Sequence, residues 1–443
     1  MSQCRSGHDT RRTIMSAIAR AKTLLRPFKA RSRHLVTFLL NVTLYPASGL
    51  FPRSPYRWVF GYTGETFADN PKYLYLWMLL FEPRIRVTWI TGSKATRNQL
   101  RRLGYPVEMR WSLHGMAAVL RAKVIVFSHG MRNVNTFLSK GAVLVNLWHG
   151  VGIKSVHLGH KGGNTAAAHR AAGGWIGRVA GIEYLRPYDI LVSTSDVMQA
   201  HFASQFQMLP ERCPQLGYPR LDCTLGSKLR EVAEGIDKTS GFTMRPDGFD
   251  EVYIYLPTYR DSGRDLFSEA LPDLRGLSDA LAARNALLYI KPHPRTQYRY
   301  GDSVENVRTW PTGIDFNTYL SDFDCLITDY SSVFYDYILH RSAVILYTFD
   351  LEEYLSKDRE LVMPFKDNVV GIPAFDFQTL CRIIRNGDAF TAQNSEAIAR
   401  LRAKFWGGSA VPASPAIVDY VMRQLTGRAF APEDVHALKE AIS

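Results

Sequence analysis

Two histidines stand directly after apolar, strand-like segments of the sequence. The run Ala142–Leu147 leads into Trp148-His149-Gly150-Val151-Gly152-Ile153-Lys154, and Leu287–Ile290 leads into Lys291-Pro292-His293-Pro294-Arg295. An imidazole titrates near neutral pH, so a histidine at such a position can accept or donate a proton during group transfer. Taken alone, His149 could equally be a core histidine, and Lys-Pro-His-Pro could be a stiff turn with a solvated lysine.

Two further strand-like segments end in hydroxyl and charged residues. Val252–Leu256 leads into Pro257-Thr258-Tyr259-Arg260, and Cys325–Ile327 leads into Thr328-Asp329-Tyr330-Ser331-Ser332. Hydroxyls, cations and exposed backbone N–H groups suit a phosphate-bearing ligand. The two serines could instead cap a helix that starts near Val333. The sequence contains neither G-x-x-x-x-G-K-[ST] nor G-x-G-x-x-G, so the P-loop and dinucleotide fingerprints lack support.

The elements that would position these residues alternate between strand and helix in two successive blocks. The expected strands are Trp58–Tyr62, Arg86–Thr91, Lys123–Ser128, Ala142–Trp148, Ile190–Ser193, Val252–Leu256, Leu287–Lys291, Cys325–Thr328 and Val344–Tyr347. The expected helices are Asn70–Leu80, Thr96–Leu103, Leu113–Arg121, Asp196–Phe206, Leu266–Arg284 and Val333–His340. A polar stretch near 235–250 separates the blocks. We therefore predict an α/β protein with two doubly wound parallel sheets, whose ligands bind at the carboxyl ends of the strands.

The composition is that of a globular protein, and most of its net positive charge lies near the N-terminus. The 443 residues exceed one ordinary core, and the five scattered cysteines form no C-x-x-C pair, which argues against a disulfide framework. Residues 1–57 carry eleven Lys or Arg and one acid, Asp9, so +10 of the formal +13 lies there. Apolar residues recur among these cations at roughly helical spacing, which suits a helix lying on an anionic bilayer. The alternative is an arm that packs on the protein itself.

Within this region, the segment 34–52 contains no Asp, Glu, Lys or Arg, but it is too short and interrupted for a spanning helix. We expect either a domain-capping helix or contact with one leaflet. No carboxylate cluster or His/Cys spacing indicates a metal site, and we interpret His157, His160 and His169 as loop residues.

Together the motifs resemble one known family. The series W-H-G-x-G-x-K (148–154), G-Y-P-R-L-D (217–222), L-P-T-Y-R (256–260), I-K-P-H-P (290–294) and I-T-D-Y-S-S-V-F-Y-D (327–336) is similar to the CDP-glycerol:poly(glycerophosphate) glycerophosphotransferases, which build teichoic acids and related capsular polymers. The order holds across about residues 57–355. One departure is Val151-Gly152, where the family commonly has Thr-Pro, so this loop lacks the family's threonine hydroxyl and its proline.

The resemblance implies a GT-B fold, in which two Rossmann-like domains face each other across a cleft. We expect a basic membrane-associating arm at 1–55, an acceptor-side domain at 56–235 and a CDP-donor domain at 236–430. The resemblance also implies transfer of an alditol phosphate from a CDP-alditol such as CDP-glycerol to a hydroxyl of a lipid-linked or polymeric acceptor, with release of CMP. The family's binding residues correspond to Trp148, His149, Gly150, Val151, Gly152, Arg220, Pro257, Thr258, Lys291, Pro292, His293, Ser331, Ser332 and Asp336.

The chemistry of these residue types assigns them roles. We predict that His149 removes the proton of the acceptor hydroxyl, and that His293 and Lys291 stabilise the charge that develops on the leaving CMP. Arg220, Ser331 and Ser332 would hold phosphate oxygens, and Asp336, one helical turn beyond Ser332, would hold a donor hydroxyl. No metal or other cofactor is expected to be required.

Two other functions stay open from the sequence. A GT-B glycosyltransferase using a nucleotide-sugar would share the fold, since function is set by the site. A nucleic-acid-binding protein could use the basic arm, but the strand-end residues would then have no role. We expect a peripheral protein on the cytoplasmic face of the cell membrane that binds no nucleic acid.

Overall fold

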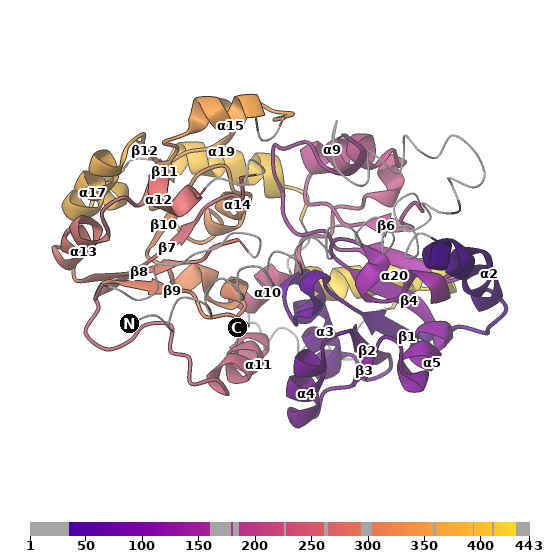
Figure 1. The fold of residues 1–443 in the computed structure, drawn as a ribbon. Helices are drawn as coiled ribbons and strands as arrows, with labels where there is room; N and C mark the ends of the chain where they lie inside the picture. The colour runs from indigo at the N-terminus through magenta and orange to yellow at the C-terminus, as the bar shows by residue number, and fades with distance from the viewer. Residues whose placement is uncertain are drawn as a thin grey trace, which may run out of the picture.

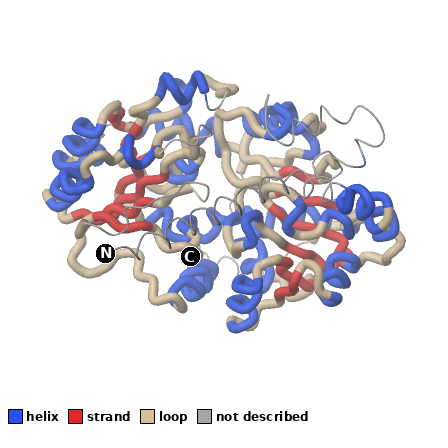
Figure 2. Tube along the Cα trace, viewed as in Figure 1, coloured by secondary structure: helices blue, strands red, loops and turns tan. Residues whose placement is uncertain are grey.

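The computed structural model contains two α/β domains side by side, each built around one parallel sheet (Figure 1). The structure describes residues 35–159, 179, 186–225, 227–260, 265–293, 304–357, 360–392, 394–409 and 412–430. Residues 1–34, which carry most of the cations of the predicted arm, lie outside the described residues, as do His160 and His169. In Figure 2 the strands form two separate groups with helices around them, as expected for a GT-B architecture.

The first sheet has the strand order β3-β2-β1-β4-β5-β6. Its central strands are runs of apolar residues that are buried on both faces, which is why they read as continuous hydrophobic segments. The strands are β1 (Ser54–Phe60), β2 (Arg86–Thr91), β3 (Val107–Met109), β4 (Ala122–Phe127), β5 (Val143–Asn146) and β6 (Ile190–Leu191). The helices around them are α3 (Asp69–Phe81), α4 (Lys94–Arg102), α5 (Leu113–Arg121) and α9 (Asp196–Phe206).

The second sheet repeats this plan with the order β12-β11-β10-β7-β8-β9. Its strands are β7 (Glu251–Leu256), β8 (Ala286–Ile290), β9 (Val307–Thr309), β10 (Cys325–Thr328), β11 (Val344–Tyr347) and β12 (Ile372–Ala374). Its helices include α12 (Leu266–Ala270), α13 (Leu274–Ala282), α14 (Val333–Tyr337), α15 (Leu351–Lys357) and α17 (Phe377–Asn386). The prediction of two doubly wound parallel sheets is confirmed.

Local predictions failed in two places. The edge strands β3, β9 and β12 were missed, because each has three residues and only partial burial. The prediction of a single helix at Leu266–Arg284 is wrong, because this segment forms two helices, α12 and α13, on either side of Pro272. Proline cannot continue a helix, and Asp273 then caps α13 by accepting from Arg275 N and Gly276 N.

The two domains are joined by helices that cross between them. The chain leaves the first domain through α10 (Pro219–Leu225) and α11 (Ser227–Lys238). It returns at the end, where α20 (Ala413–Thr426) contacts α3, β1 and α10. Asp222 on α10 fixes this return, because its carboxylate accepts from Ala413 N and Ser414 N, both at 2.7 Å. The boundaries proposed at 56–235 and 236–430 stay predictions.

The start of the described chain lies on the first domain. Residues 35–42 are helical and α2 (Leu44–Ser48) follows. Arg53, counted among the cations of the arm, has a structural role, since its guanidinium donates to the carbonyls of Val119, Ala122 and Leu138. Among the residues that the structure describes, no helix combines the length and the apolar character needed to cross a bilayer.

Candidate active site

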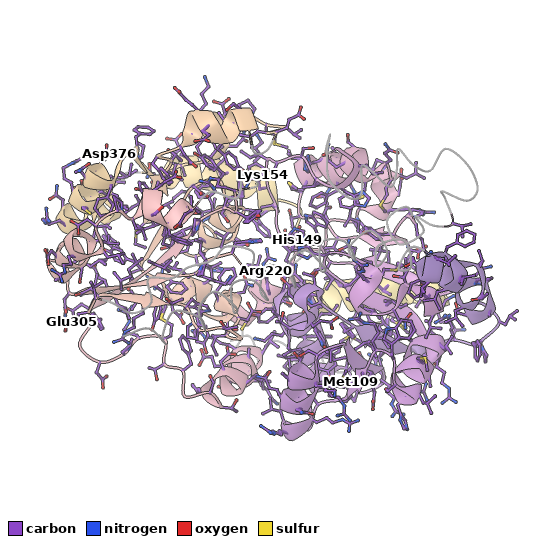
Figure 3. The ribbon with its side chains drawn as sticks, in the orientation of Figure 1. Met109, His149, Lys154, Arg220, Glu305 and Asp376 are labelled. Atoms are coloured by element: carbon purple, nitrogen blue, oxygen red, sulfur yellow. The ribbon has the colours of Figure 1, made fainter. Side chains whose placement is uncertain are left out.

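A cavity of about 180 Å³ lies between the domains, where the loops after β5 and β10 face each other. The first domain contributes Trp148 to Lys154, and the second contributes Tyr330, Ser331 and Ser332. The structure thus brings together seven of the predicted site residues: Trp148, His149, Gly150, Val151, Gly152, Ser331 and Ser332. Figure 3 shows His149, Lys154 and Arg220 at this junction.

The loop after β5 has its shape because neighbouring side chains bind its backbone. Trp148 has a φ of 55°, in the left-handed region that few non-glycine residues adopt. Asn146 Oδ1 accepts from Trp148 N at 2.8 Å, and Asn70 Nδ2 donates to Trp148 O at 3.0 Å. Further along, Val362 N of the second domain donates to Ile153 O at 2.7 Å. The loop is therefore tied to both domains.

His149 is oriented by a backbone carbonyl. Its Nδ1 lies 3.1 Å from Ser128 O, an atom that can only accept, so Nδ1 carries the proton in the neutral ring. Nε2 is then the basic nitrogen. This is the arrangement that a general base requires, and it agrees with the role predicted for His149.

His129 is a residue of this site that the sequence interpretation missed. It follows β4 by two residues, and its ring stacks on that of His149 with centroids 3.6 Å apart and 9° between the planes. The rule that draws attention to residues after each apolar strand applies to Lys123–Ser128 as well. Applied there, it would have found Ser128 and His129.

Glycine at position 150 allows the two domains to approach closely. A Cβ on Gly150 would lie 2.9 Å from Ser332 Oγ, closer than such atoms come in real structures. Ser332 stands at the N-cap of α14, yet its side chain makes no capping hydrogen bond. Its hydroxyl therefore faces Gly150 rather than the helix end.

Arg220 lies between the domains and joins a carboxylate from each. Its Nη1 donates to Asp69 Oδ1 at 2.7 Å, and its Nη2 donates to Asp336 Oδ2 at 2.8 Å. Burial raises the pKa of Asp336 to about 6, although Arg220 opposes the shift. Burial disfavours the charge of Arg220, but Asp336 and Asp69 outweigh this effect and raise its pKa. Arg220 Nε, Asp69 Oδ2 and Asp336 Oδ1 are buried with no hydrogen-bond partner.

Arg260 organises the second domain's side of the site. Its guanidinium donates to Asp329 Oδ2 at 2.8 Å, to both oxygens of Asp350, and to Thr258 O at 2.6 Å. Asp329 in turn accepts from Thr258 N at 2.9 Å. The loops after β7 and β10 are thereby fixed to each other, which places Pro257 and Thr258 beside the strand end that carries the two serines. Lys154 Nζ of the first domain lies 3.4 Å from Thr258 Oγ1.

The predicted residues after β8 lie at the carboxyl end of that strand, which is at the same edge of the sheet as the loops after β7 and β10. Lys291 Nζ is 4.9 Å from the centre of the Phe316 ring, and burial lowers the pKa of Lys291 against the opposing effect of Asp315. Pro292 is half-buried, while His293 is exposed with its ring 5.1 Å from that of Tyr259. His293 also helps to lower the pKa of His129, so the histidines of the two domains are within electrostatic reach.

The decisive comparison is with known families. A sequence profile of the CDP-Glycerol:Poly(glycerophosphate) glycerophosphotransferase family matches residues 52–423. The chain belongs to this family. The suspected resemblance is thereby confirmed over most of the chain, well beyond the quoted motifs.

Curated relatives of this glycerophosphotransferase-family chain act on teichoic acids, according to their names. The teichoic acid ribitol-phosphate primase of Bacillus spizizenii is 27% identical over 254 residues, which are 55% of this chain and 61% of the relative. The teichoic acid poly(glycerol phosphate) polymerase of Staphylococcus epidermidis is 26% identical over 381 residues, 82% of this chain and 50% of the relative. The chain thus spans about half to three-fifths of the length of these two relatives.

A solved structure shows the same fold. The wall teichoic acid polymerase TagF superposes with a TM-score of 0.68 at 22% identity, and the match covers 93% of this chain and 98% of that one. This likeness confirms the predicted two-domain architecture.

The roles of the individual site residues stay predictions. The described residues contain no group of three His, Cys, Asp or Glu side chains placed to hold a metal ion. His157, interpreted as a loop residue, lies in a short turn of 3₁₀ helix and stacks on Phe206 with ring centroids 4.3 Å apart.

Proposed function

We propose that this glycerophosphotransferase-family protein transfers glycerol phosphate or a related alditol phosphate from a CDP-activated donor to a hydroxyl of a lipid-linked or polymeric cell-surface acceptor. The observation that carries the proposal is the position of His149, whose Nδ1 is held by Ser128 O, across one cavity from Ser331 and Ser332. A base thus faces hydroxyls suited to a phosphate. A TagF structure soaked with CDPG supports a donor of this class.

The reaction needs a proton acceptor and a place for negative charge. The acceptor oxygen attacks the phosphorus that carries the alditol, a P–O bond forms, and the bond to the CMP oxygen breaks. His149 Nε2 takes the hydroxyl proton as this attack develops, because an alcohol is a poor nucleophile at neutral pH. The departing CMP gains charge, which Lys291 and His293 stabilise from the loop after β8.

The donor is held by groups from both domains. Ser331, Ser332 and Arg220 bind phosphate oxygens, and the backbone of Gly150 to Gly152 closes the opposite side. Asp336 accepts a hydrogen bond from a donor hydroxyl through Oδ1, the oxygen that has no partner in this structure. Pro257 and Thr258 line the donor-binding loop of the second domain, and Pro292 shapes the turn that presents His293.

A donor panel tests this function. The purified protein is incubated with CDP-glycerol, CDP-ribitol, a UDP-sugar or a GDP-sugar, with a short glycerol phosphate oligomer as acceptor, and nucleotide release is measured. We expect CMP from a CDP-alditol only. Release of UDP or GDP from a sugar nucleotide would support the glycosyltransferase alternative and overturn the proposal.

Two substitutions test the histidines. His149→Ala and His293→Ala should each lower kcat by about 10²–10⁴-fold, the usual loss for a general acid or base. Neither residue is needed for the fold, so the urea unfolding midpoint of each variant is the control. A drop of only about twofold in a folded variant would remove that histidine from the mechanism.

We also propose that the protein attaches to the cytoplasmic face of an anionic membrane through its N-terminal region. The support is the charge of +10 within residues 1–57 and the exposed apolar side chains of the same segment, among them Leu35 and Leu39 (59% and 48% exposed) and Leu50 (85%). A lipid-linked acceptor lies in the membrane, so attachment would raise its local concentration. Cations near an anionic surface contribute about 1 kcal/mol each.

Liposome flotation tests the attachment. The variant Leu35→Ser/Leu39→Ser/Leu50→Ser should bind anionic vesicles at least about tenfold more weakly. Each leucine that is replaced no longer contributes the free energy gained when its side chain moves from water into the lipid. Phe375→Ser, which removes a side chain that is 61% exposed on the second domain, is the matched control. Equal flotation of the triple variant and the wild type would contradict the proposal.

A further inference from the structure

His129 is packed against the predicted base but is not among the residues assigned to substrate. It follows β4, which lies next to β5 in the first sheet, so the strand ends bring His129 and His149 together. The ring centroids are 3.6 Å apart, and the planes are nearly parallel. Tyr62 meets the His129 ring edge-on at 5.9 Å.

We propose that His129 is a positioning residue, which holds the ring of His149 flat so that Nε2 points to the acceptor hydroxyl. The proposal rests on the function proposed above, because it gives His149 the role of base. Ser128 O fixes the position of Nδ1 of His149, and a hydrogen bond at one ring nitrogen does not by itself set the tilt of the ring. A flat ring packed on one face removes that freedom, and Trp148, 4.1 Å away between ring centroids, limits it from the adjacent position.

The surroundings of His129 keep its own ring neutral. Its Nδ1 is buried and makes no hydrogen bond. Burial is the main cause that lowers its pKa well below the usual value, with His149 and His293 adding to the effect and Asp69 opposing it. Two imidazolium rings 3.6 Å apart would repel each other strongly, so the two rings are not protonated together. Stacked rings cannot pass a proton directly, so His129 acts on His149 by packing.

Two substitutions separate packing from the imidazole itself. His129→Phe retains a flat ring that can stack, whereas His129→Ala removes the ring. We expect kcat to fall by about 10- to 100-fold in His129→Ala, since small misplacements of a reacting group have costs of this size. His129→Phe should lose much less, about threefold. The KM for CDP-glycerol should change by less than about threefold in both, because the donor phosphates bind elsewhere.

The tautomer of His149 gives a readout that general destabilisation would not produce. In ¹⁵N NMR spectra at a pH where His149 is neutral, the wild type should show the proton on Nδ1. The His129→Phe spectrum should retain this tautomer, and His129→Ala should show exchange toward the Nε2–H form. The His149 signals are assigned by their loss in His149→Gln.

His340→Ala is the matched control, because it removes a half-buried imidazole of the second domain, beside Thr224 and away from the cavity. It should leave kcat and the His149 tautomer unchanged. The inference is overturned if His129→Ala retains wild-type kcat and tautomer, or if His129→Phe loses as much kcat as His129→Ala. If no CDP-alditol is consumed by the wild type, the proposed function fails, while the tautomer measurement still tests the contact between the two rings.

Discussion

Two buried arginines of the molecule are used in different ways. Arg260 lies within the second domain, and each nitrogen of its guanidinium has a partner among Asp329, Asp350 and Thr258 O. Arg220 lies between the domains and binds Asp69 and Asp336, but its Nε and one oxygen of each carboxylate have no partner.

The difference is the one expected between a scaffold and the proposed binding site. A buried polar group without a partner costs about 1–3 kcal/mol, so such groups are rare unless something else binds there. In the Arg260 cluster every guanidinium nitrogen already has a partner, and these bonds fix two loops to each other. The Arg220 cluster has unused donors and acceptors beside Gly150 and Ser332, where the donor is proposed to bind. The incomplete hydrogen bonding of the Arg220 cluster therefore agrees with the proposed donor site.

The largest expected effect is on stability at Arg260. Arg260→Met should lower the free energy of unfolding by about 3–5 kcal/mol, because Asp329 and Asp350 would stay buried without their cation. Urea denaturation measures this loss. The control is Arg284→Met, which breaks the partly exposed pair with Glu251 and should cost about 1 kcal/mol or less. Similar losses in the two variants would refute the scaffold role.

At Arg220 the expected effect falls on the donor. Arg220→Met should raise the KM for CDP-glycerol by about 10- to 100-fold, which corresponds to the loss of one charged hydrogen bond. The loss of stability should be smaller than at Arg260, because Asp336, with a pKa of about 6, can take up a proton once the cation is gone. Steady-state kinetics and urea denaturation give the two numbers.

A second interdomain arginine provides the control for this experiment. Arg230 on α11 pairs with Glu234 and with Asp322 of the second domain. Unlike Arg220, it is not one of the groups next to Gly150. Arg230→Met should leave the KM for the donor unchanged. A KM that rises equally in both variants would mean that the domain interface, rather than Arg220 itself, sets donor affinity.

The sequence predicted the sheets and one side of the site for a clear physical reason. Parallel strands buried on both faces are continuous apolar runs, so β2, β10 and β11 were placed with their observed bounds, and the residues after them could be inspected. Short edge strands have no such signal. The helix predicted over Leu266–Arg284 did not take account of Pro272, although proline breaks helices.

The polar clusters could not be predicted, because their members are far apart in the chain. Arg220 is 151 residues from Asp69 and 116 from Asp336, and nothing in one sequence pairs them. Arg220 and Asp336 were each assigned to substrate, and the structure adds that they bind each other and Asp69. The stacking of His129 on His149 likewise depends on the order of β4 and β5 in the sheet.

A smaller effect is expected from the pH dependence of the Arg220 cluster. The folded-state pKa of Asp336, about 6, exceeds its ordinary value of 3.8, so the folded protein holds this proton more tightly than the unfolded chain. Its contribution to stability is complete below the unfolded pKa and is lost as the pH rises through about 6. Asp336→Asn should remove up to about 3 kcal/mol of the fall in unfolding free energy over this interval. Urea denaturation at several pH values measures the slope, and an unaltered slope would show that Asp336 does not titrate there.

The smallest expected effect is that of removing divalent ions. If Arg220 and Lys291 neutralise the donor's phosphates, no resident metal is needed, and EDTA should change kcat by less than about twofold. A metal bound to the donor could still assist slightly, so the assay compares EDTA with added Mg²⁺ at saturating CDP-glycerol. The comparison becomes sharper in Arg220→Met, where Mg²⁺ should restore part of the lost donor affinity, because the ion supplies the missing positive charge. Complete loss of wild-type activity in EDTA, restored by a divalent ion, would show that the protein cations are insufficient.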